Sequence, residues 1–464
     1  MSVRSAFPAV VLLGLLLSLP AIHNGFPLIF PDSGTYLAIG FGSEYAIDRS
    51  SVYGFLLKPL LALAPGVAGL WIAIAVQLLA VALALWAAAA IFDRGGSPWR
   101  RLAWIAPTAL LTALPWHAGQ FMPDAFTGIL ILLVWLAASR DPLGDGTPAL
   151  WAAIVLCTSV HHTHLPLLLV AAAASILAQR ITGESWRACL RRGLAALVAA
   201  AIVTGAWIAT NGLALGRWTV SPTGAVFIYA RLNEDGLIGP WLDRHCGRDA
   251  PAPLCALRDR LPRDSQRLLW TGSDTPVTEL IWQPANRADR WPWVDMMAQA
   301  NRGAILENPG RFLASSFRGF VHQFVSFQPL DDLCPNSCRD LSGGIAYQLN
   351  VYRPDTVPAL LASRQSQGTT PKALVRAIAW PIQLVGLILL LPALVLAWRR
   401  RDTPAFSLFA AVGAALLVNA AMAGALSDVH DRYQSRLIWL APFVLLIAAR
   451  GWRERGARPA AQAP

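Results

Sequence analysis

Residues 67–92, VAGLWIAIAVQLLAVALALWAAAAIF, form a run of apolar side chains without a single charge. About 20 such residues are enough for a helix to cross the hydrocarbon core of a bilayer. The whole chain is 55% hydrophobic and only 14% charged, whereas soluble domains carry about 25% charged residues. A single water-soluble globule is therefore excluded. Nine further apolar runs occupy residues 6–23, 102–115, 123–138, 149–160, 164–179, 194–213, 375–397, 404–426 and 437–449.

These runs predict a mainly α, polytopic membrane protein with about ten transmembrane helices and one mixed extracytoplasmic domain. Residues 1–213 are expected to form an N-terminal membrane core of seven spans whose outer loops carry the chemistry. Residues 214–372 are rich in Arg, Asp, Pro and Trp, and we expect them to form the outer domain from short helices and loops. Residues 373–464 supply three more spans and a basic tail.

The formal net charge of +11 is confined largely to alternate loops. These loops and the two chain ends hold 16 basic but only six acidic residues. Cytoplasmic loops of membrane proteins carry such an excess of Lys and Arg, so the charge indicates orientation rather than nucleic-acid binding. Both termini are predicted to be cytoplasmic. No small-residue cleavage pattern follows the first run, which we interpret as a retained span.

Four of the six cysteines lie in the predicted outer domain. They are Cys246, Cys255, Cys334 and Cys338. Disulfides form in oxidising extracytoplasmic compartments, so we expect two bridges here, with Cys246–Cys255 and Cys334–Cys338 as one of three pairings that the sequence leaves open. A four-thiolate zinc site is the rival interpretation, but these spacings differ from the usual zinc knuckles.

Two aspartates stand at outer helix ends. Asp32 lies in Phe30-Pro-Asp-Ser-Gly-Thr-Tyr-Leu37, in a long and apolar first outer loop. A carboxylate there can act as a general base, or it can cap a helix that starts at Ser33. Asp124 opens the fourth predicted span, where a carboxylate is also favoured by the helix dipole. A functional hypothesis places both carboxylates at one cavity.

Polar clusters precede two further spans on the same side of the membrane. His161, His162 and His164 interrupt the chain between the fifth and sixth spans, where they either satisfy a broken helix or bind phosphate or metal. Arg432 and Arg436 precede the last span, and arginine holds phosphate with two hydrogen bonds. Four separate outer loops thus carry groups that are typical of one active site.

These residues resemble the GT-C membrane glycosyltransferases, in particular the branch of protein O-mannosyltransferases and the lipid A aminoarabinose transferase. Met122-Pro-Asp-Ala-Phe-Thr-Gly-Ile-Leu-Ile-Leu-Leu133 is similar to the Pro-Asp opening of a long apolar helix in that branch. Arg432-Tyr-Gln-Ser-Arg-Leu-Ile-Trp-Leu-Ala-Pro442 resembles its Arg-Tyr…Pro closing segment. The family often has a Lys-Gly-Pro-like stretch where this chain has His164-Leu-Pro166.

The resemblance implies transfer of a sugar from a polyprenyl phosphate to a lipid, glycan or protein acceptor at the outer face of a bacterial cytoplasmic (inner) membrane. It makes Asp32 the base and assigns Asp124 to positioning the substrate or an optional divalent metal. Fixed cations stabilise the charge on a departing phosphate. The residues that the resemblance assigns to the phosphate are His162, His164, Arg432 and Arg436, with Lys58, Arg231 and Tyr36 as weaker candidates.

Three other classes of protein stay open. An O-antigen polymerase or ligase also uses polyprenyl-linked sugars, and its key residues are expected in a late loop, here Arg311, Arg318 and His322. A transporter typically shows internal repeats and broken helices at mid-membrane, and this chain has no such repeat. A non-enzymatic assembly protein would use the outer domain to dock a partner.

Overall fold

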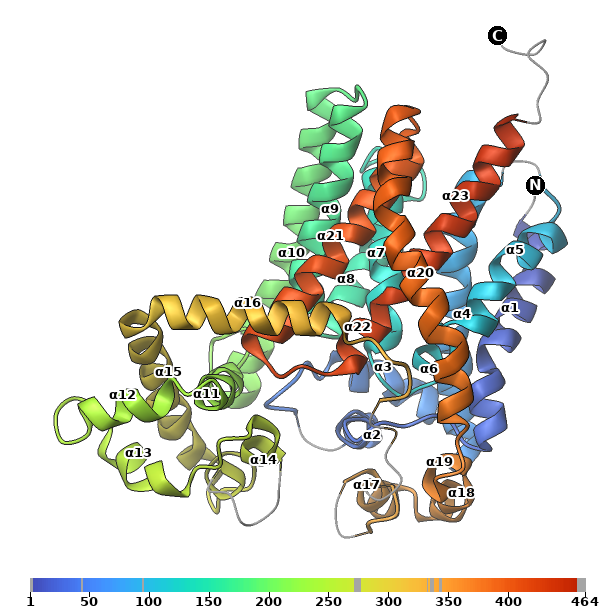
Figure 1. Cartoon of the computed structure of the whole chain (residues 1–464). Helices are drawn as coiled ribbons and strands as arrows, with labels where there is room; N and C mark the ends of the chain where they lie inside the picture. Colours follow the sequence, from blue (N-terminus) through green and yellow to red (C-terminus); the bar gives the residue numbers. More distant parts are fainter. Residues whose placement is uncertain are drawn as a thin grey trace.

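The structure is a computed structural model that describes residues 3–42, 45–93, 96–270, 277–331, 333, 338–341 and 344–456. These residues form helices and no β-strand, apart from an isolated bridge between Leu28 and Gln120. The chain is therefore mainly α, and its long apolar helices run side by side in one bundle (Figure 1). This arrangement confirms the predicted polytopic membrane protein.

Within the described ranges, seven helical segments are long and apolar enough to cross a membrane. They are α1 (Val3–Asn24), α4 (Gly66–Phe92), α9 (His164–Ile181), α10 (Trp186–Leu215), α20 (Lys372–Arg399), α21 (Thr403–Leu426) and the consecutive pair α22 (Asp431–Ile438) and α23 (Leu440–Gly456).

The three other predicted spans correspond to shorter helices, α5 (Pro98–Leu111), α7 (Asp124–Ala138) and α8 (Thr147–Ser159). They have 14, 15 and 13 residues, so at about 1.5 Å per residue each is about 20 Å long. That length is less than the roughly 30 Å of a bilayer core. The count of ten crossings therefore stays a prediction.

The short helix α7 lies in the middle of the bundle, where nearly all its side chains are buried. Gly128 contacts the indole of Trp439, and an added Cβ at Gly128 would lie 2.3 Å from that ring. Trp135, one turn before the other end of α7, donates a hydrogen bond to Ser407 of α21. These contacts fix the start of α7, with Asp124, beside α22.

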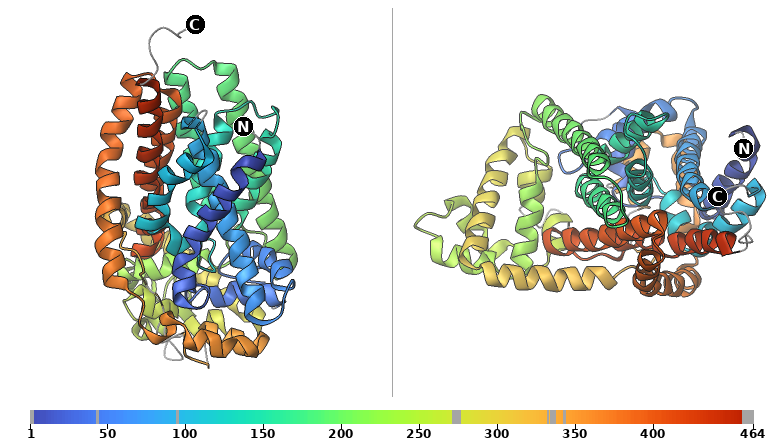
Figure 2. Two further views of the ribbon diagram at one scale, coloured as in Figure 1. Left: turned by 90° about the vertical axis from the view of Figure 1, so that its right-hand side faces the viewer. Right: turned by 90° about the horizontal axis from the view of Figure 1, so that it is seen from above.

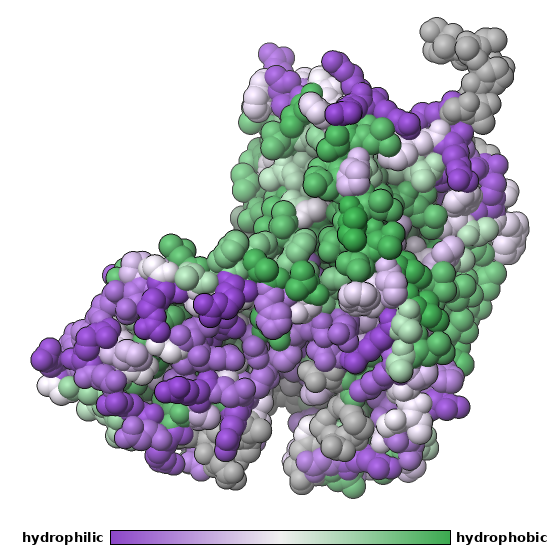
Figure 3. Space-filling model, viewed as in Figure 1, coloured by the Kyte–Doolittle hydropathy of each residue, from purple (hydrophilic) through white to green (hydrophobic). Residues whose placement is uncertain are grey.

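Charge is distributed unevenly between the two ends of the bundle. Both chain ends lie toward one end (Figures 1 and 2), where Arg100, Arg101 and Arg450 surround the buried Asp93. On the face drawn in Figure 3, a hydrophilic cap lies at this end, an apolar band covers the spans, and a second hydrophilic region lies at the opposite end. The opposite end carries the smaller helices α2 (Ser33–Phe41), α3 (Val52–Leu61) and α6 (Leu114–Ala118).

Part of the predicted outer domain has a hydrophobic core of its own, built around residues such as Tyr229, Trp241 and Met297. Its helices are α11 (Gly224–Glu234), α12 (Ile238–His245), α13 (Ala252–Leu257), α14 (Ser265–Trp270) and α15 (Arg290–Glu307). They form an arm beside the lower end of the bundle (Figure 1). Helix α16 (Pro309–Val325) joins this arm to the bundle.

Residues of the predicted domain 214–372 contribute to two hydrophobic cores, and the domain boundary itself stays a prediction. Phe327 and Ile345 belong to the core of the membrane bundle rather than to that of the arm. Helices α17 (Gly344–Tyr352), α18 (Val357–Ala362) and α19 (Arg364–Gln367) cover the end of the bundle. Composition alone identified this region as polar, but it did not distinguish the arm from the cover.

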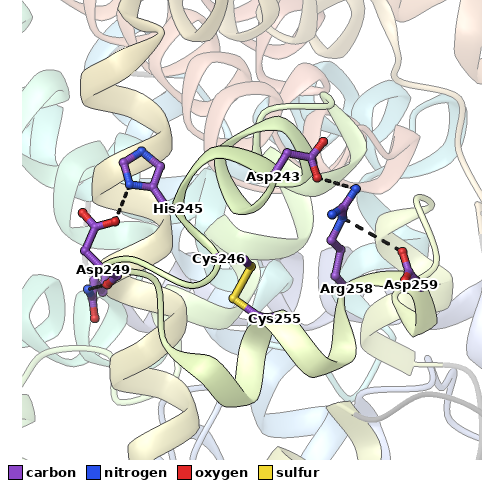
Figure 4. Close-up of a disulfide and its surroundings, with 8 residues drawn as sticks. Asp243, His245, Cys246, Asp249, Cys255, Arg258 and Asp259 are labelled. Atoms are coloured by element: carbon purple, nitrogen blue, oxygen red, sulfur yellow. Dashed lines mark hydrogen bonds and ion pairs between the residues drawn. A yellow bond between two sulfur atoms is a disulfide. The ribbon is translucent and has the colours of Figure 1, made fainter.

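The predicted Cys246–Cys255 disulfide is confirmed, and it closes the loop between α12 and α13 (Figure 4). Cys338 is also disulfide-bonded, whereas Cys334 lies outside the described residues. The cysteines at 246 and 255 are thus bonded to each other, which contradicts the alternative of a four-thiolate zinc site.

Candidate active site

A cavity of about 840 Å³ opens at the end of the bundle opposite the chain ends. Its wall combines α2 and the loop before it, the residues Leu330, Asp331 and Leu333, the start of α20, α14, and the loop between α21 and α22. The lining residues are Phe30, Pro31, Asp32, Thr35, Arg49, Gln266, Trp270, Leu330, Asp331, Leu333, Gly344, Lys372, Arg376, His430, Arg432 and Tyr433. Four Lys or Arg side chains face two carboxylates, so the cavity suits an anion.

Asp32 places its carboxylate in this cavity instead of capping α2. It occupies the N-cap position without a side-chain hydrogen bond to the helix, which removes the structural explanation offered by the sequence. Its Oδ1 lies 3.0 Å from Nη1 of Arg49, and its Oδ2 accepts a hydrogen bond from Nη1 of Arg432 at 3.4 Å. Burial raises the pKa of Asp32, but these two guanidinium groups hold it below the usual value. Asp32 is therefore ionised at neutral pH.

Arg432 bridges the two predicted aspartates. Its guanidinium lies 3.9 Å from the centroid of the Phe30 ring, which supports it from the cavity wall. Its Nη1 contacts Asp32, and its Nε lies 3.7 Å from Oδ2 of Asp124. One face of Arg432 is thus fixed by protein groups while the residue still lines the cavity.

Asp124 lies behind Arg432 and does not line the cavity. Its side chain is fully buried at the first residue of α7, and its Oδ1 accepts a hydrogen bond from Arg436 at 2.8 Å. Arg436 also donates to Thr163 and Asn419. Neither Asp124 nor Arg436 is among the residues that line the cavity, and their expected contact with substrate or metal stays a prediction. Asp124 lies between Arg436 and Arg432 and links the two guanidinium groups.

Two cavity cations were not predicted from the sequence. Lys372 and Arg376 stand one turn apart at the start of α20, and the side chain of each donates a hydrogen bond to a backbone carbonyl, of Leu333 and Pro329 respectively. Among the described residues, neither forms an ion pair with a carboxylate. A signal was present: basic residues beside a span are uncommon on the outer side, and Lys372 is one of only two lysines in the chain.

The predicted histidine cluster is separate from the cavity. His164 is buried, with Nδ1 2.6 Å from the carbonyl oxygen of Cys157 and Nε2 2.9 Å from the Thr127 hydroxyl. A carbonyl only accepts, so Nδ1 carries the proton and both ring nitrogens are used. His162 packs edge-on against Trp207, and burial lowers its pKa to about 4, which makes it neutral at pH 7. We therefore leave both histidines out of the phosphate site.

The three weaker candidates also lie apart from the cavity lining. Lys58 is exposed on α3, and Arg231 pairs with Asp235 on α11 at 3.1 Å. Tyr36 is buried on α2, where Arg49 lies 5.6 Å from its ring centroid. Burial raises the pKa of the Tyr36 hydroxyl well above its usual value. Tyr36 thus supports Arg49 as a neutral aromatic side chain.

The cavity region offers few ligands for a divalent metal. Over the described ranges, no group of three or more His, Cys, Asp or Glu side chains is arranged to hold a metal ion. Asp32, a carboxylate of the cavity lining, is paired with Arg49 and Arg432. These residues do not fit the optional metal that the resemblance implies.

Comparison of the chain with protein-family models, with curated proteins and with solved structures finds no match.

Proposed function

We propose that this protein is a membrane glycosyltransferase that moves a sugar from a polyprenyl-phosphate donor to an acceptor on the outer face of the membrane. The observation that carries the proposal is the cavity in which ionised Asp32 faces Arg432, Lys372 and Arg376 at one end of the helical bundle. A carboxylate for an acceptor hydroxyl and several cations for a phosphate are what this reaction requires. The sequence resemblance to GT-C enzymes supports the same reaction.

In the proposed reaction, the hydroxyl oxygen of the acceptor attacks the anomeric carbon while its proton passes to the Asp32 carboxylate. The bond between the anomeric carbon and the phosphate oxygen breaks, and its electron pair stays with the departing polyprenyl phosphate. Arg432, Lys372 and Arg376 would stabilise that charge. A single displacement of this kind inverts the anomeric centre, as the resemblance implies.

The buried residues behind the cavity would keep the cation in place during this step. Asp124 and Arg436 hold Arg432 from inside the bundle. The Asp124 carboxylate lies 3.7 Å from Nε of Arg432 and 2.8 Å from Nη1 of Arg436. A guanidinium fixed in this way loses little freedom when charge develops beside it. Asp124 and Arg436 are therefore positioning residues in this proposal.

The proposed setting is the cytoplasmic membrane of a bacterium, with ten spans, both termini in the cytoplasm and the cavity and arm in the periplasm. The basic residues gathered at the end that carries the termini support this orientation. The Cys246–Cys255 disulfide in the arm is consistent with an oxidising compartment. The acceptor would enter the cavity from the periplasmic side, next to the arm and to the short helices α17, α18 and α19 that cover the end of the bundle.

The polymerase or ligase alternative receives less support from the geometry. Arg311, Arg318 and His322 are exposed on α16, and none of them lines the cavity. No observation specifically favours a transporter or an assembly protein.

The direct test is sugar transfer by purified protein in liposomes that contain a panel of polyprenyl-phosphate sugars and extracted acceptor lipids. Asp32→Asn should lower the rate at least about 100-fold, the usual contribution of a general base. Asp48→Asn is the matched control, because Asp48 also pairs with Arg49 but does not line the cavity. Equal activity of Asp32→Asn and wild type would refute the proposed base.

A further inference from the structure

Helix α16 carries a row of exposed apolar side chains along its whole length. Leu313, Phe317, Val321 and Val325 are 65%, 66%, 46% and 58% exposed. Residues four apart lie on the same side of a helix, so the four form one continuous apolar stripe. Such a surface in water would be unfavourable.

The other sides of α16 have a different character. Gly319 packs against Gly424 of α21 so closely that a Cβ at Gly319 would lie 2.0 Å from the Gly424 carbonyl oxygen. Arg311 and Arg318, seven residues apart, are exposed on a third side. The helix therefore has a packed face, an apolar face and a basic face between them, which is the pattern of helices that lie at a membrane surface.

The orientation of α16 agrees with that pattern. Figure 1 shows α16 running across the direction of the membrane spans, at the level where α21 ends. In Figure 3 the upper edge of this part of the molecule is apolar and meets the apolar band of the bundle, while the surface below it is hydrophilic. Leu426, the last residue of α21 and two residues after Gly424, is also exposed.

We propose that α16 is an in-plane membrane anchor whose apolar stripe lies in the outer interface of the same bilayer that holds the spans. The occupant of the stripe is lipid: acyl chains cover Leu313, Phe317, Val321 and Val325, and Arg311 and Arg318 extend to lipid phosphates. The continuity of the stripe with the apolar band and the charge of its basic flank carry this inference. It does not depend on the proposed glycosyltransferase activity.

The anchor is connected directly to the cavity. The side chain of the buried Gln323 donates to the carbonyl of His430 at 2.8 Å and accepts from its backbone N–H at 2.9 Å. Just beyond the helix, the backbone N–H of Gln328 donates to Asp431 at 2.9 Å. His430 and Arg432 form part of the cavity wall. The depth of α16 in the interface therefore fixes the level of this wall, which places the cavity at the headgroup layer.

Spin labels test the position of the stripe in the full chain reconstituted in phospholipid vesicles. Cys157 and Cys189, the free thiols among the described cysteines, are first replaced by alanine, and this parent protein gives the labelling background. Labels at Leu313→Cys, Phe317→Cys and Val321→Cys should collide more with oxygen than with an aqueous nickel chelate. A label at the exposed Glu279→Cys in the arm should show the reverse. An aqueous signature at all three stripe positions would overturn the proposal.

Two further outcomes are informative. Dipolar broadening between stripe labels that disappears on dilution with unlabelled protein would show that a second copy covers the stripe, and it would also overturn the proposal. Phe317→Glu should make amide hydrogens of residues 426–433 exchange about tenfold faster, whereas Phe317→Leu should leave them unchanged. Equal exchange in Phe317→Glu and wild type would refute the link from anchor to cavity.

Discussion

Asp124→Asn removes the negative charge from a buried cluster of ion pairs that Asp124 forms with Arg432 and Arg436. Asp124 begins α7 with a fully buried side chain, and it faces Arg436 at 2.8 Å and Arg432 at 3.7 Å. The Arg436 side chain is only 1% exposed. Its other hydrogen-bond partners, Thr163 and Asn419, are neutral. The substitution therefore leaves the buried Arg436 without a carboxylate partner, and Arg432 keeps only Asp32.

The size of the effect follows from this burial. Removing one partner of a buried ion pair costs about 3–5 kcal/mol, because the remaining charge stays in a medium that solvates it poorly. An asparagine at position 124 retains an oxygen that can accept from Arg436, so we expect the lower end of that range. Replacing both partners by apolar residues of similar volume is close to neutral in other proteins, and Asp124→Leu with Arg436→Met should recover much of the lost stability.

SDS-induced unfolding in mixed micelles measures this difference in free energy. Asp295→Asn is the matched control, because Asp295 also pairs with an arginine, Arg217, but its side chain is 58% exposed. We expect the control to lose less than about 1 kcal/mol. A loss in Asp124→Asn as small as in the control would refute the interpretation of Asp124 as a buried positioning charge.

Three further predictions concern the cavity and the arm. Lys372→Met should raise KM for the donor by about 10- to 100-fold, as expected for a lost charge-assisted contact. Lys372→Arg should restore KM, and the exposed control Lys58→Met should leave it unchanged. An unchanged KM in Lys372→Met would contradict a phosphate contact. Because the folded pKa of Asp32 is lowered, its ionised form adds stability above about pH 4 that is lost as the pH falls through the folded pKa. The stability difference between wild type and Asp32→Asn should therefore shrink on acidification, and a constant difference would count against the ion pairs. Cys246→Ser with Cys255→Ser should destabilise the arm by about 2–3 kcal/mol for a loop of this length. Limited proteolysis should then cut faster between α12 and α13 while the bundle stays intact. Equal proteolysis of the variant and wild type would show that the disulfide is dispensable.

The membrane bundle could be predicted from the sequence because apolar runs without charge have few other solutions. Each of the ten predicted runs corresponds to a helix or a pair of helices. The predicted runs 102–115, 123–138 and 149–160 are as short as the helices α5, α7 and α8 that they form, so helix length matched the sequence here too. The split of residues 214–372 between two cores, by contrast, depended on long-range packing that composition does not encode.

The candidate site was predicted in part. Asp32 and Arg432 meet in the cavity, although 400 residues separate them, and their common position at helix ends on one side of the bundle was readable from the sequence. Burial decided the other assignments. Asp124 and His164 each begin a helix, but their side chains are buried in the bundle. A short motif gives the level of a residue along the membrane normal and does not give the direction of its side chain.

Mass spectrometry of the lipids that co-purify with the protein tests the proposed donor most directly. Wild type and Asp32→Asn would be extracted from the native membrane and compared with Lys372→Met. We predict polyprenyl phosphate bound to wild type, the same lipid with its sugar retained on Asp32→Asn, and depletion of both in Lys372→Met. Ordinary membrane phospholipids alone in all three proteins would contradict the account of the cavity as a site for a phosphate-linked lipid.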